Sequence, residues 1–225
     1  MQPKPILHGL YVITNNDREQ TTAGLLQQVT QAIAGGARIV QYRDKSHDFK
    51  RRQQQALALR ELCHQHQIPL IINDDPELAR QAGADGVHLG RDDGSITSAR
   101  EQLGEQALIG VSCYNQLDSA ILAEQAGADY VAFGSFYHSP SKPQAVIAPV
   151  SLLEEARERL TIPIVAIGGI TVENGANLLA AGATTLAVIS GVFGQTNITA
   201  TTQAYARLFD NNRNHEGSNV YCSKL

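Results

Sequence analysis

Tryptophan is absent from this sequence, and aromatic residues, methionine and cysteine are all scarce. Only 5% of the 225 residues are aromatic and one is methionine, so small aliphatic side chains must fill most of any core. The three cysteines, Cys63, Cys113 and Cys222, share no metal-binding or redox spacing. Because their number is odd and residues Met1 to Ile6 contain no apolar signal segment, we expect a protein of the reducing cytoplasm.

Strong charge of either sign and long apolar runs are missing as well. The net charge is −4, from 18 basic and 22 acidic residues, and no basic stripe follows an expected helix face. The run Lys50-Arg51-Arg52 is interpreted as the solvated start of a helix. We therefore expect no nucleic-acid partner. No apolar run approaches the roughly 20 residues that span a bilayer, so no membrane partner is expected either.

The sequence does contain a short glycine turn that recurs before apolar strands. A helix that ends at glycine and leads into a parallel strand is an αβ unit. With 43% hydrophobic residues and barrel length, the chain is expected to be an α/β protein with a single (β/α)8 TIM barrel over residues 1–210. The polar segment 211–225 is expected to be a disordered tail. The turns are Gly35-Gly36-Ala37, Ala82-Gly83-Ala84, Ala126-Gly127-Ala128 and Ala181-Gly182-Ala183.

Hydrophobic periodicity predicts eight strands and eight helices in alternation. The strands are expected at Leu10–Ile13, Arg38–Tyr42, Leu70–Ile72, Gly86–Leu89, Leu108–Val111, Tyr130–Phe133, Ile164–Ile167 and Thr185–Val188. The helices are expected at about Thr22–Ala34, Phe49–Gln67, from Pro76 onward, Ile96–Leu103, Leu117–Ala126, Leu152–Leu160, Val172–Ala181 and Thr199–Phe209. Active sites of such barrels lie at the C-terminal ends of the strands, so the polar residues there are the candidates.

The end of the second expected strand carries an amide and two cations. Because strand side chains alternate, Gln41, Arg43 and Lys45 are expected to point the same way, toward the barrel axis. Such a group suits a phosphate or diphosphate. Taken alone, this motif is better explained by a solvated loop with salt bridges to Asp44 or Asp48.

Carboxylates follow the third and fourth expected strands, in Asn73-Asp74-Asp75 and Asp92-Asp93. These strands are neighbours in a barrel, and Mg²⁺ commonly takes one or two carboxylates together with water and substrate phosphate. The alternative is that the aspartates cap helices, which fits Asp75 because Pro76 follows it. Both interpretations hold if one carboxylate of each pair caps a helix and the other binds metal.

Three later segments have the composition of anion sites. Ser139-Pro140-Ser141-Lys142 lies in a long loop, 134–149, where two hydroxyls and an ammonium group could hold an anion, although serine and proline also abound in surface turns. Gly168-Gly169 and Ser190-Gly191 follow the seventh and eighth strands, where these barrels usually bind phosphate. The alternative for the glycine pair is a tight turn that needs positive φ.

Taken in order on successive strand ends, these motifs resemble the thiamine phosphate synthase family from Leu10 to Leu208. The resemblance implies that a pyrimidine diphosphate, 4-amino-5-hydroxymethyl-2-methylpyrimidine diphosphate, joins 4-methyl-5-(2-phosphooxyethyl)thiazole and releases pyrophosphate. It implies Mg²⁺ as the cofactor, a pyrimidine-stabilised carbocation, and capture of that cation by the thiazole nitrogen. The motifs are Gln41-Tyr42-Arg43-Asp44-Lys45, Ile72-Asn73-Asp74-Asp75, His88-Leu89-Gly90-Arg91-Asp92-Asp93, Gly110-Val111-Ser112, Ser139-Pro140-Ser141-Lys142, Ala166-Ile167-Gly168-Gly169-Ile170 and Val188-Ile189-Ser190.

The resemblance also implies roles for individual residues. Asp74 and Asp93 would be the Mg²⁺ ligands. The catalytic residues would be Arg43, Lys45, Ser112 and Lys142. Apart from these four, the substrate-binding positions would be Gln41, Tyr42, Asp44 and Asn73 on the diphosphate side, and Ser139, Pro140, Ser141, Gly169, Ile189 and Ser190 on the thiazole phosphate side.

Two other functions are weighed against this one. A thiazole tautomerase on the same barrel would need a general acid or base and no diphosphate site. A non-catalytic barrel that binds phosphate ligands would use the carboxylates only as caps. The full set of cations and carboxylates favours the synthase, a transferase whose partners are small molecules, and a homodimer is an open option for its assembly.

Overall fold

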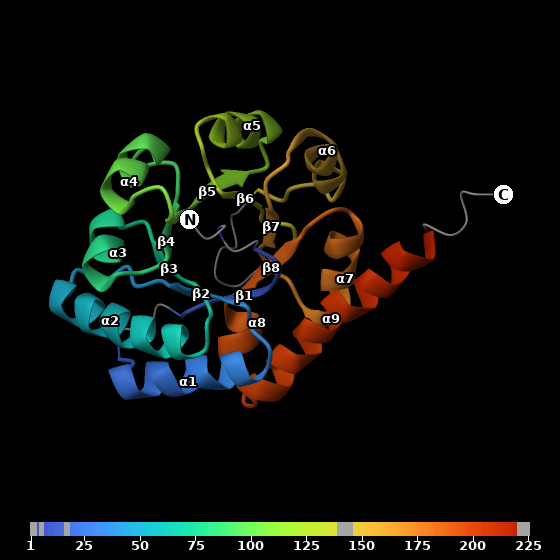
Figure 1. Cartoon of the computed structure of the whole chain (residues 1–225). Helices are drawn as coiled ribbons and strands as arrows, with labels where there is room; N and C mark the ends of the chain where they lie inside the picture. Colours follow the sequence, from blue (N-terminus) through green and yellow to red (C-terminus); the bar gives the residue numbers. More distant parts are fainter. Residues whose placement is uncertain (1–3, 5–6, 16–18, 139–145, 220–225) are drawn as a thin grey trace.

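Eight parallel strands form a closed barrel in which each strand pairs with the next in sequence and β8 pairs with β1 (Figure 1). The computed structural model describes residues 4, 7–15, 19–138 and 146–219, without the side chains of 211–219. This arrangement confirms the predicted TIM barrel. The strands are β1 Gly9–Ile13, β2 Ile39–Tyr42, β3 Leu70–Asn73, β4 Gly86–Leu89, β5 Leu108–Tyr114, β6 Tyr130–Phe133, β7 Ile164–Ile167 and β8 Thr185–Val188.

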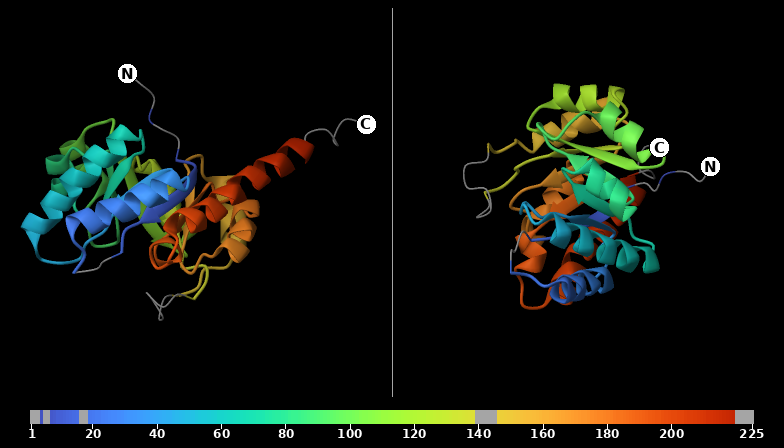
Figure 2. Two further views of the ribbon diagram at one scale, coloured as in Figure 1. Left: turned by 90° about the horizontal axis from the view of Figure 1, so that it is seen from below. Right: turned by 90° about the vertical axis from the view of Figure 1, so that its left-hand side faces the viewer.

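Helices surround the barrel and run between its strands (Figures 1 and 2). Several begin where the sequence offers an N-cap, as at Thr21, Asp48 and Thr171, whose side chains each accept a backbone N–H of the first turn. The helices are α1 Thr22–Ala34, α2 Phe49–Gln65, α3 Pro76–Ala82, α4 Ile96–Leu103, α5 Leu117–Gln125, α6 Ser151–Arg159, α7 Val172–Ala180, α8 Ser190–Phe193 and α9 Ile198–Asn219.

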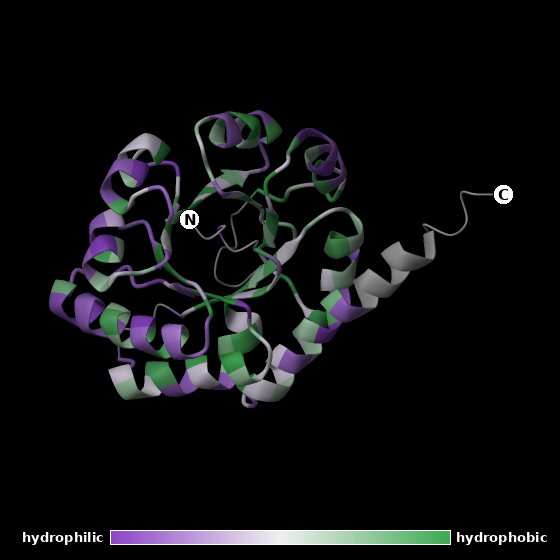
Figure 3. Ribbon diagram, in the orientation of Figure 1, coloured by the Kyte–Doolittle hydropathy of each residue, from purple (hydrophilic) through white to green (hydrophobic). Residues whose placement is uncertain are grey.

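Side chains that alternate along the strands build two separate hydrophobic clusters. The larger cluster fills the layer between strands and helices, with Val12, Val40 and Leu186 among its strand residues. The smaller cluster fills the barrel interior, and Tyr11 and Tyr130 are its largest members. Figure 3 shows the apolar ring of strands inside helices whose outer faces are polar. The interior cluster matters for function because it forms the floor beneath the C-terminal ends of the strands.

The residue after three of the four recurring turns closes the N-terminal end of the barrel. Asp85 Oδ2 accepts the N–H of Leu70 at 2.8 Å, and Asp129 Oδ2 accepts the N–H of Ile109 at 2.8 Å. Thr184 Oγ1 accepts the N–H of Ile164 at 3.1 Å. Each side chain therefore satisfies an N–H at the start of a neighbouring strand, which explains why a short polar residue follows each of these turns.

Replacing Asp129 with alanine should destabilise the barrel by about 2–3 kcal/mol. The substitution leaves the Ile109 N–H without its acceptor, and an unsatisfied buried donor costs about 1–3 kcal/mol. It also removes the ion pairs of Asp129 with Arg100 at 2.7 Å and with Lys4 at 2.6 Å. Urea unfolding measures the loss. The exposed Asp118→Ala on α5 is the control and should change the unfolding free energy by under about 0.5 kcal/mol. Equal effects of the two substitutions would contradict this account.

Apart from shifts of one or two residues at element ends, the structure differs from the predicted elements in three places. Strand β5 continues three residues beyond the predicted end at Val111, through a register shift between Ser112 and Tyr114. Helix α8 was not predicted, because four residues are too few to show a period. Helix α9 continues ten residues past the predicted end at Phe209 and so covers part of the segment expected to be disordered, of which residues 220–225 lie outside the described part. Within the described residues, no helix combines the length and the apolar character needed to cross a membrane.

Candidate active site

Polar side chains meet at the C-terminal end of the barrel interior, above the interior cluster. Gln41 of β2 and His88 of β4 are buried there, and Ser112 of β5 is half-buried. Asn73, the last residue of β3, pairs in register with His88. Gln41 is therefore inside the barrel, as the alternation predicts.

A continuous row of hydrogen bonds crosses this part of the interior. Gln41 Nε2 donates to Tyr11 Oη at 2.7 Å, and Tyr11 Oη lies 3.0 Å from Tyr130 Oη. Tyr130 Oη lies 3.1 Å from His88 Nδ1, and His88 Nε2 lies 2.9 Å from Ser112 Oγ. Two residues predicted to bind substrate, Gln41 and Ser112, are thus joined through three residues that were not predicted to act.

A cation and two carboxylates lie together at the ends of β2, β3 and β4. Lys45 forms an ion pair with Asp74, and the Asp93 carboxyl lies close enough to Asp74 for the two to influence each other's charge. Asp93 Oδ2 also accepts the Gly90 N–H at 2.8 Å. Asp74 has a positive φ of 65°, a conformation that aspartate tolerates better than most residues, and its N–H donates to the His88 carbonyl at 2.8 Å. The predicted metal ligands are therefore neighbours, with Lys45 beside them.

The environment of Asp93 opposes its ionisation. Partial burial and the nearby Asp74 carboxylate raise the pKa of Asp93 above its ordinary value of 3.8, against the opposing effects of the Gly90 N–H and Lys45. The folded protein therefore binds a proton at Asp93 more readily than the unfolded chain does. Without a bound cation, the stability contributed by protonated Asp93 is present at low pH and is lost as pH rises through the raised pKa.

Replacing Asp93 with asparagine should stabilise the cation-free protein at neutral pH, by about 0.2–1 kcal/mol for a partly solvated charge pair. The reason is that asparagine keeps an acceptor for the Gly90 N–H and removes the unfavourable negative charge beside Asp74. Urea unfolding in excess chelator, at pH 7 and at acidic pH, measures the change. The gain should shrink at acidic pH, where wild-type Asp93 is protonated. A variant less stable than wild type at both values of pH would contradict the prediction.

The remaining aspartates of these loops have different roles. Asp75 caps α3, since its Oδ1 accepts the Leu78 N–H at 2.9 Å, and it also pairs with Arg52 at 2.7 Å. One carboxylate after β3 was predicted to cap a helix and the other to bind metal. Asp75 is the one that caps. After β4 the capping prediction is wrong, because Ser95 caps α4 by accepting the Ser98 N–H at 3.1 Å.

Two of the predicted binding residues lie on the outer side of β2. The buried Tyr42 donates its hydroxyl to Gln55 of α2 at 2.8 Å, and Asp44 pairs with Arg51 of α2 at 2.6 Å. These contacts anchor α2 to the strand end. The structure therefore separates Tyr42 and Asp44 from the interior group. Arg43 is half-buried, and its backbone N–H donates to Thr14 Oγ1 at 2.9 Å.

Glycine loops follow β7 and β8 on the other side of the barrel mouth. Gly168 and Gly169 have positive φ values of 102° and 63°, and a Cβ on Gly169 would lie 2.5 Å from the His138 carbonyl oxygen. The Gly169 carbonyl accepts Asn174 Nδ2 at 3.0 Å, and Asn174 belongs to the capping box of α7. This conformation matches the turn that a glycine pair predicts, and the backbone of Tyr137 and His138 packs directly against it.

The loop after β8 begins the short helix α8. Ile189 is its N-cap residue and packs partly against the interior cluster, and Ser190 is its first residue. Gly191 lies close under the Tyr205 hydroxyl of α9, which donates to the Ile170 carbonyl at 2.9 Å. Both glycine loops are thus supported by one tyrosine of α9. The predicted Ser139, Pro140, Ser141 and Lys142 lie outside the described residues.

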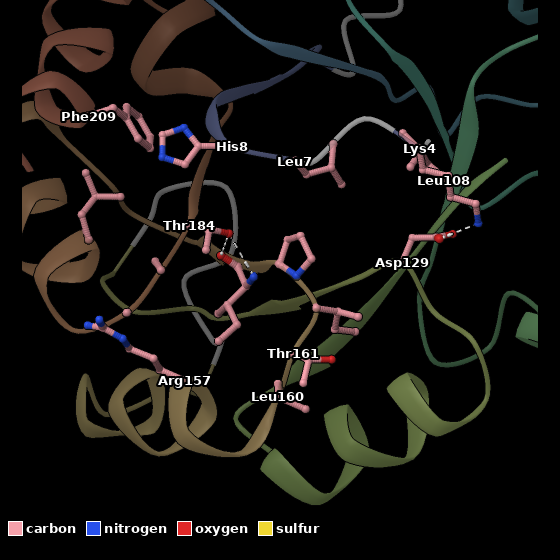
Figure 4. A pocket seen from close by; sticks show the side chains of 16 residues that line it. Lys4, Leu7, His8, Leu108, Asp129, Arg157, Leu160, Thr161, Thr184 and Phe209 are labelled. Carbon is pink, nitrogen blue, oxygen red and sulfur yellow. Dashed lines mark hydrogen bonds and ion pairs between the residues drawn. The ribbon is translucent and has the colours of Figure 1, made fainter. Parts of the chain in front are cut away.

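The N-terminal end of the barrel contains a cavity of about 580 Å³, shown in Figure 4. Leu7, Leu108 and Phe209 are among its apolar lining residues. Two charged groups of its wall pair with each other, Lys4 Nζ and Asp129 Oδ1 at 2.6 Å. Because the paired carboxylates and the glycine loops lie at the opposite end, we assign the functional site there.

Tyr11, His88 and Tyr130 are the polar interior residues that the sequence analysis missed as site residues. The alternation that selected Gln41 also selects His88, since both are inward residues near a strand end. Tyr11 and Tyr130 give no such signal, because a tyrosine in an apolar strand is indistinguishable from a core residue until its hydroxyl is located.

Comparison with known proteins agrees with this geometry. The chain matches the family described as thiamine monophosphate synthase over residues 10–192. It is 52% identical over 203 residues to the thiamine-phosphate synthase of Nitrosococcus oceani, covering 90% of this chain and 93% of that protein. It is 49% identical over 204 residues to the one of Thioalkalivibrio sulfidiphilus, covering 91% and 96%. The solved thiamine phosphate pyrophosphorylase of Pyrococcus furiosus superposes with a TM-score of 0.82 at 31% identity, covering 91% and 96%.

Proposed function

Since this chain belongs to the thiamine monophosphate synthase family and is a transferase, we propose which substrates it joins and which residues act on each. The substrates are 4-amino-5-hydroxymethyl-2-methylpyrimidine diphosphate and 4-methyl-5-(2-phosphooxyethyl)thiazole, and the products are thiamine phosphate and pyrophosphate. The observation that carries the proposal is the division of the barrel mouth, with a cation and two carboxylates on one side and glycine loops on the other.

The diphosphate is proposed to bind at the ends of β2 to β5. Lys45 lies next to the carboxylate pair, and Arg43 directly follows β2, where its backbone N–H bonds to Thr14. Both cations are proposed to contact the diphosphate. Gln41, Asn73 and Ser112 supply neutral polar groups from adjacent strands. Lys142 of the long loop is proposed as a further cation on the basis of the family resemblance.

The side chains of Asp74 and Asp93 fit a divalent cation bound by oxygen. They are close enough to raise the pKa of Asp93, and a cation between them would relieve that repulsion. The proposed ligand set is these two carboxylates together with substrate oxygens and water. Bound Mg²⁺ would supply charge neutralisation of the diphosphate as it leaves.

The thiazole phosphate is proposed to bind at the loops after β7 and β8. Backbone N–H groups of glycine loops approach phosphate oxygens closely because no side chain intervenes, and Gly169 has the required conformation. Ser190 adds a hydroxyl, and Ile189 offers an apolar contact. Ser139 and Ser141 complete the proposal from the resemblance alone.

Catalysis then depends on positioning and electrostatics. The bond between the pyrimidine methylene carbon and the diphosphate oxygen breaks, and the oxygen keeps the electron pair. Arg43, Lys45 and Ser112 stabilise the negative charge of that leaving group by hydrogen bonds and proximity. The thiazole nitrogen, held by its phosphate on the other side of the mouth, forms the new bond to the methylene carbon.

Competition experiments with inorganic pyrophosphate test the two-site assignment. Pyrophosphate with Mg²⁺ should compete with the pyrimidine diphosphate and should not compete with the thiazole phosphate. Inorganic phosphate alone should compete with the thiazole phosphate in the absence of pyrophosphate. Competition of pyrophosphate with both substrates would contradict the division of the mouth. Isomerisation of a thiazole phosphate carboxylate without condensation would favour the tautomerase, and binding without turnover would favour a non-catalytic barrel.

A further inference from the structure

The hydrogen-bond row beneath the proposed diphosphate site joins residues from five strands. Gln41 and Tyr11 come from β2 and β1, Tyr130 from β6, His88 from β4 and Ser112 from β5. The two tyrosines are 1% and 0% exposed, and Gln41 is 2% exposed. Because water does not reach these hydroxyls, their bonding is determined by the row itself.

The barrel is shaped to hold Tyr130 in the middle of this row. A Cβ at Gly110, on the neighbouring strand, would overlap the Tyr130 ring, so a glycine at that position makes room for the ring. The ring stacks on His88 with centroids 5.6 Å apart and meets Tyr11 edge-on at 6.2 Å. Its hydroxyl therefore lies within bonding distance of Tyr11 on one side and of His88 on the other.

The donor at one end sets the direction of the whole row. Gln41 Nε2 can only donate, so Tyr11 Oη accepts there and has its own proton to give. Tyr11 gives that proton to Tyr130, and Tyr130 gives its proton to His88 Nδ1. His88 must then carry its ring proton on Nε2 and donate it to Ser112 Oγ. The opposite direction would leave the Tyr11 proton without an acceptor in the row.

This direction determines what Ser112 can offer. Its oxygen accepts from His88, so its own proton is available to an anionic acceptor such as a diphosphate oxygen. The raised pKa values of the buried Tyr11 and Tyr130 hydroxyls, caused mainly by burial, keep both phenols protonated as the row requires. At the other end, the Gln41 amide is held in one orientation, since its NH₂ group faces Tyr11.

We propose that Tyr11, Tyr130 and His88 are positioning residues, which hold Gln41 and Ser112 through this one-directional row so that Ser112 donates to the diphosphate. The inference rests on the proposed function only in placing a diphosphate at Gln41 and Ser112. The position of the His88 proton follows from the hydrogen bonds alone and can be measured without any substrate.

Nitrogen NMR of the ligand-free protein tests the direction first. The spectrum should show a neutral His88 ring protonated at Nε2, and the His88→Gln variant assigns that signal among the seven histidines. A proton on Nδ1 would overturn the proposal whatever the substrates are. If the proton is on Nε2 but neither predicted substrate is converted, the proposed function fails and the direction of the row stands.

Tyr130→Phe then tests whether the row positions the site. Without the Tyr130 proton to fix Nδ1 as an acceptor, both neutral tautomers of His88 should be populated. The value of kcat/KM for the pyrimidine diphosphate should fall by about 10-fold or more, which is the effect of losing a partner that orients a binding residue. KM for the thiazole phosphate should change by less than about twofold. Tyr11→Phe, which breaks the row on the Gln41 side, should lower the same kcat/KM if Tyr130→Phe does not fold.

Thr185→Val is the matched control. It also removes one buried hydroxyl bond, from Thr185 Oγ1 to the Leu7 carbonyl at 3.1 Å, but at the opposite end of the barrel. Its His88 spectrum and kcat/KM should equal those of wild type. Wild-type kcat/KM in folded Tyr130→Phe, or an equal loss in Thr185→Val, would overturn the positioning role.

Discussion

Replacing Asp74 with asparagine should lower kcat by about 10²–10³ while leaving thiazole phosphate binding unchanged. Asparagine keeps the shape of the side chain and tolerates the positive φ of 65° at this position, so the barrel should fold. What is lost is the charge that pairs with Lys45 and that would share a cation with Asp93. Steady-state assays at saturating Mg²⁺, with calorimetry of thiazole phosphate binding, measure the two effects separately.

Asp92→Asn is the matched control for this prediction. Asp92 is the exposed neighbour of Asp93 in the same loop, so its substitution removes an equal charge from the same region without touching the carboxylate pair. Its kcat should stay within about twofold of the wild-type value. Similar losses for the two variants would mean that the general negative charge of the loop, and not the Asp74–Asp93 pair, supports turnover.

Replacing Gly169 with alanine should lower kcat/KM for the thiazole phosphate by about 100-fold, the effect of a misplacement near 1 Å. The new Cβ would lie 2.5 Å from the His138 carbonyl oxygen and 2.6 Å from that of Tyr137. Both atoms belong to the backbone, so the whole loop has to move. Stability should also fall by about 1–3 kcal/mol from overpacking, in addition to the cost of the positive φ.

Gly83→Ala separates these two contributions. Gly83 has the same φ of 63° at the end of α3, but a Cβ there would meet nothing within 4 Å. It should therefore lose only the stability that a left-handed residue costs, about 1–2 kcal/mol, with kinetics like wild type. If Gly169→Ala behaves like Gly83→Ala in both assays, the close packing of the loop after β7 is not needed for binding.

The fold was predictable because its local signals agree with one another. The recurring glycine turns mark where helices end, and the polar residue after three of them closes the barrel at Asp85, Asp129 and Thr184. Period-2 alternation places Gln41 inside the barrel, and it is found there. The strand ends predicted carboxylates after β3 and β4, and the family resemblance selected Asp74 and Asp93 among them.

The rest depended on contacts between residues far apart in sequence. Alternation with the inward Gln41 already places Tyr42 on the outer face of β2, but the sequence does not reveal that its hydroxyl bonds to Gln55 of α2. Several polar residues near α4 could cap it, and backbone geometry selects Ser95 over Asp92 and Asp93. The hydrogen-bond row of the barrel interior could not be predicted for the same reason, since it joins residues up to 119 positions apart.

The most direct test of the proposed function is the formation of thiamine phosphate from the two purified precursors, with and without Mg²⁺. The account predicts thiamine phosphate and pyrophosphate in equal amounts, formed only when both precursors and the cation are present. It also predicts that chelator stops the reaction and that restored Mg²⁺ recovers it. Product formed at the same rate in excess chelator would contradict the role given to Asp74 and Asp93, and no product under any condition would contradict the proposed substrates.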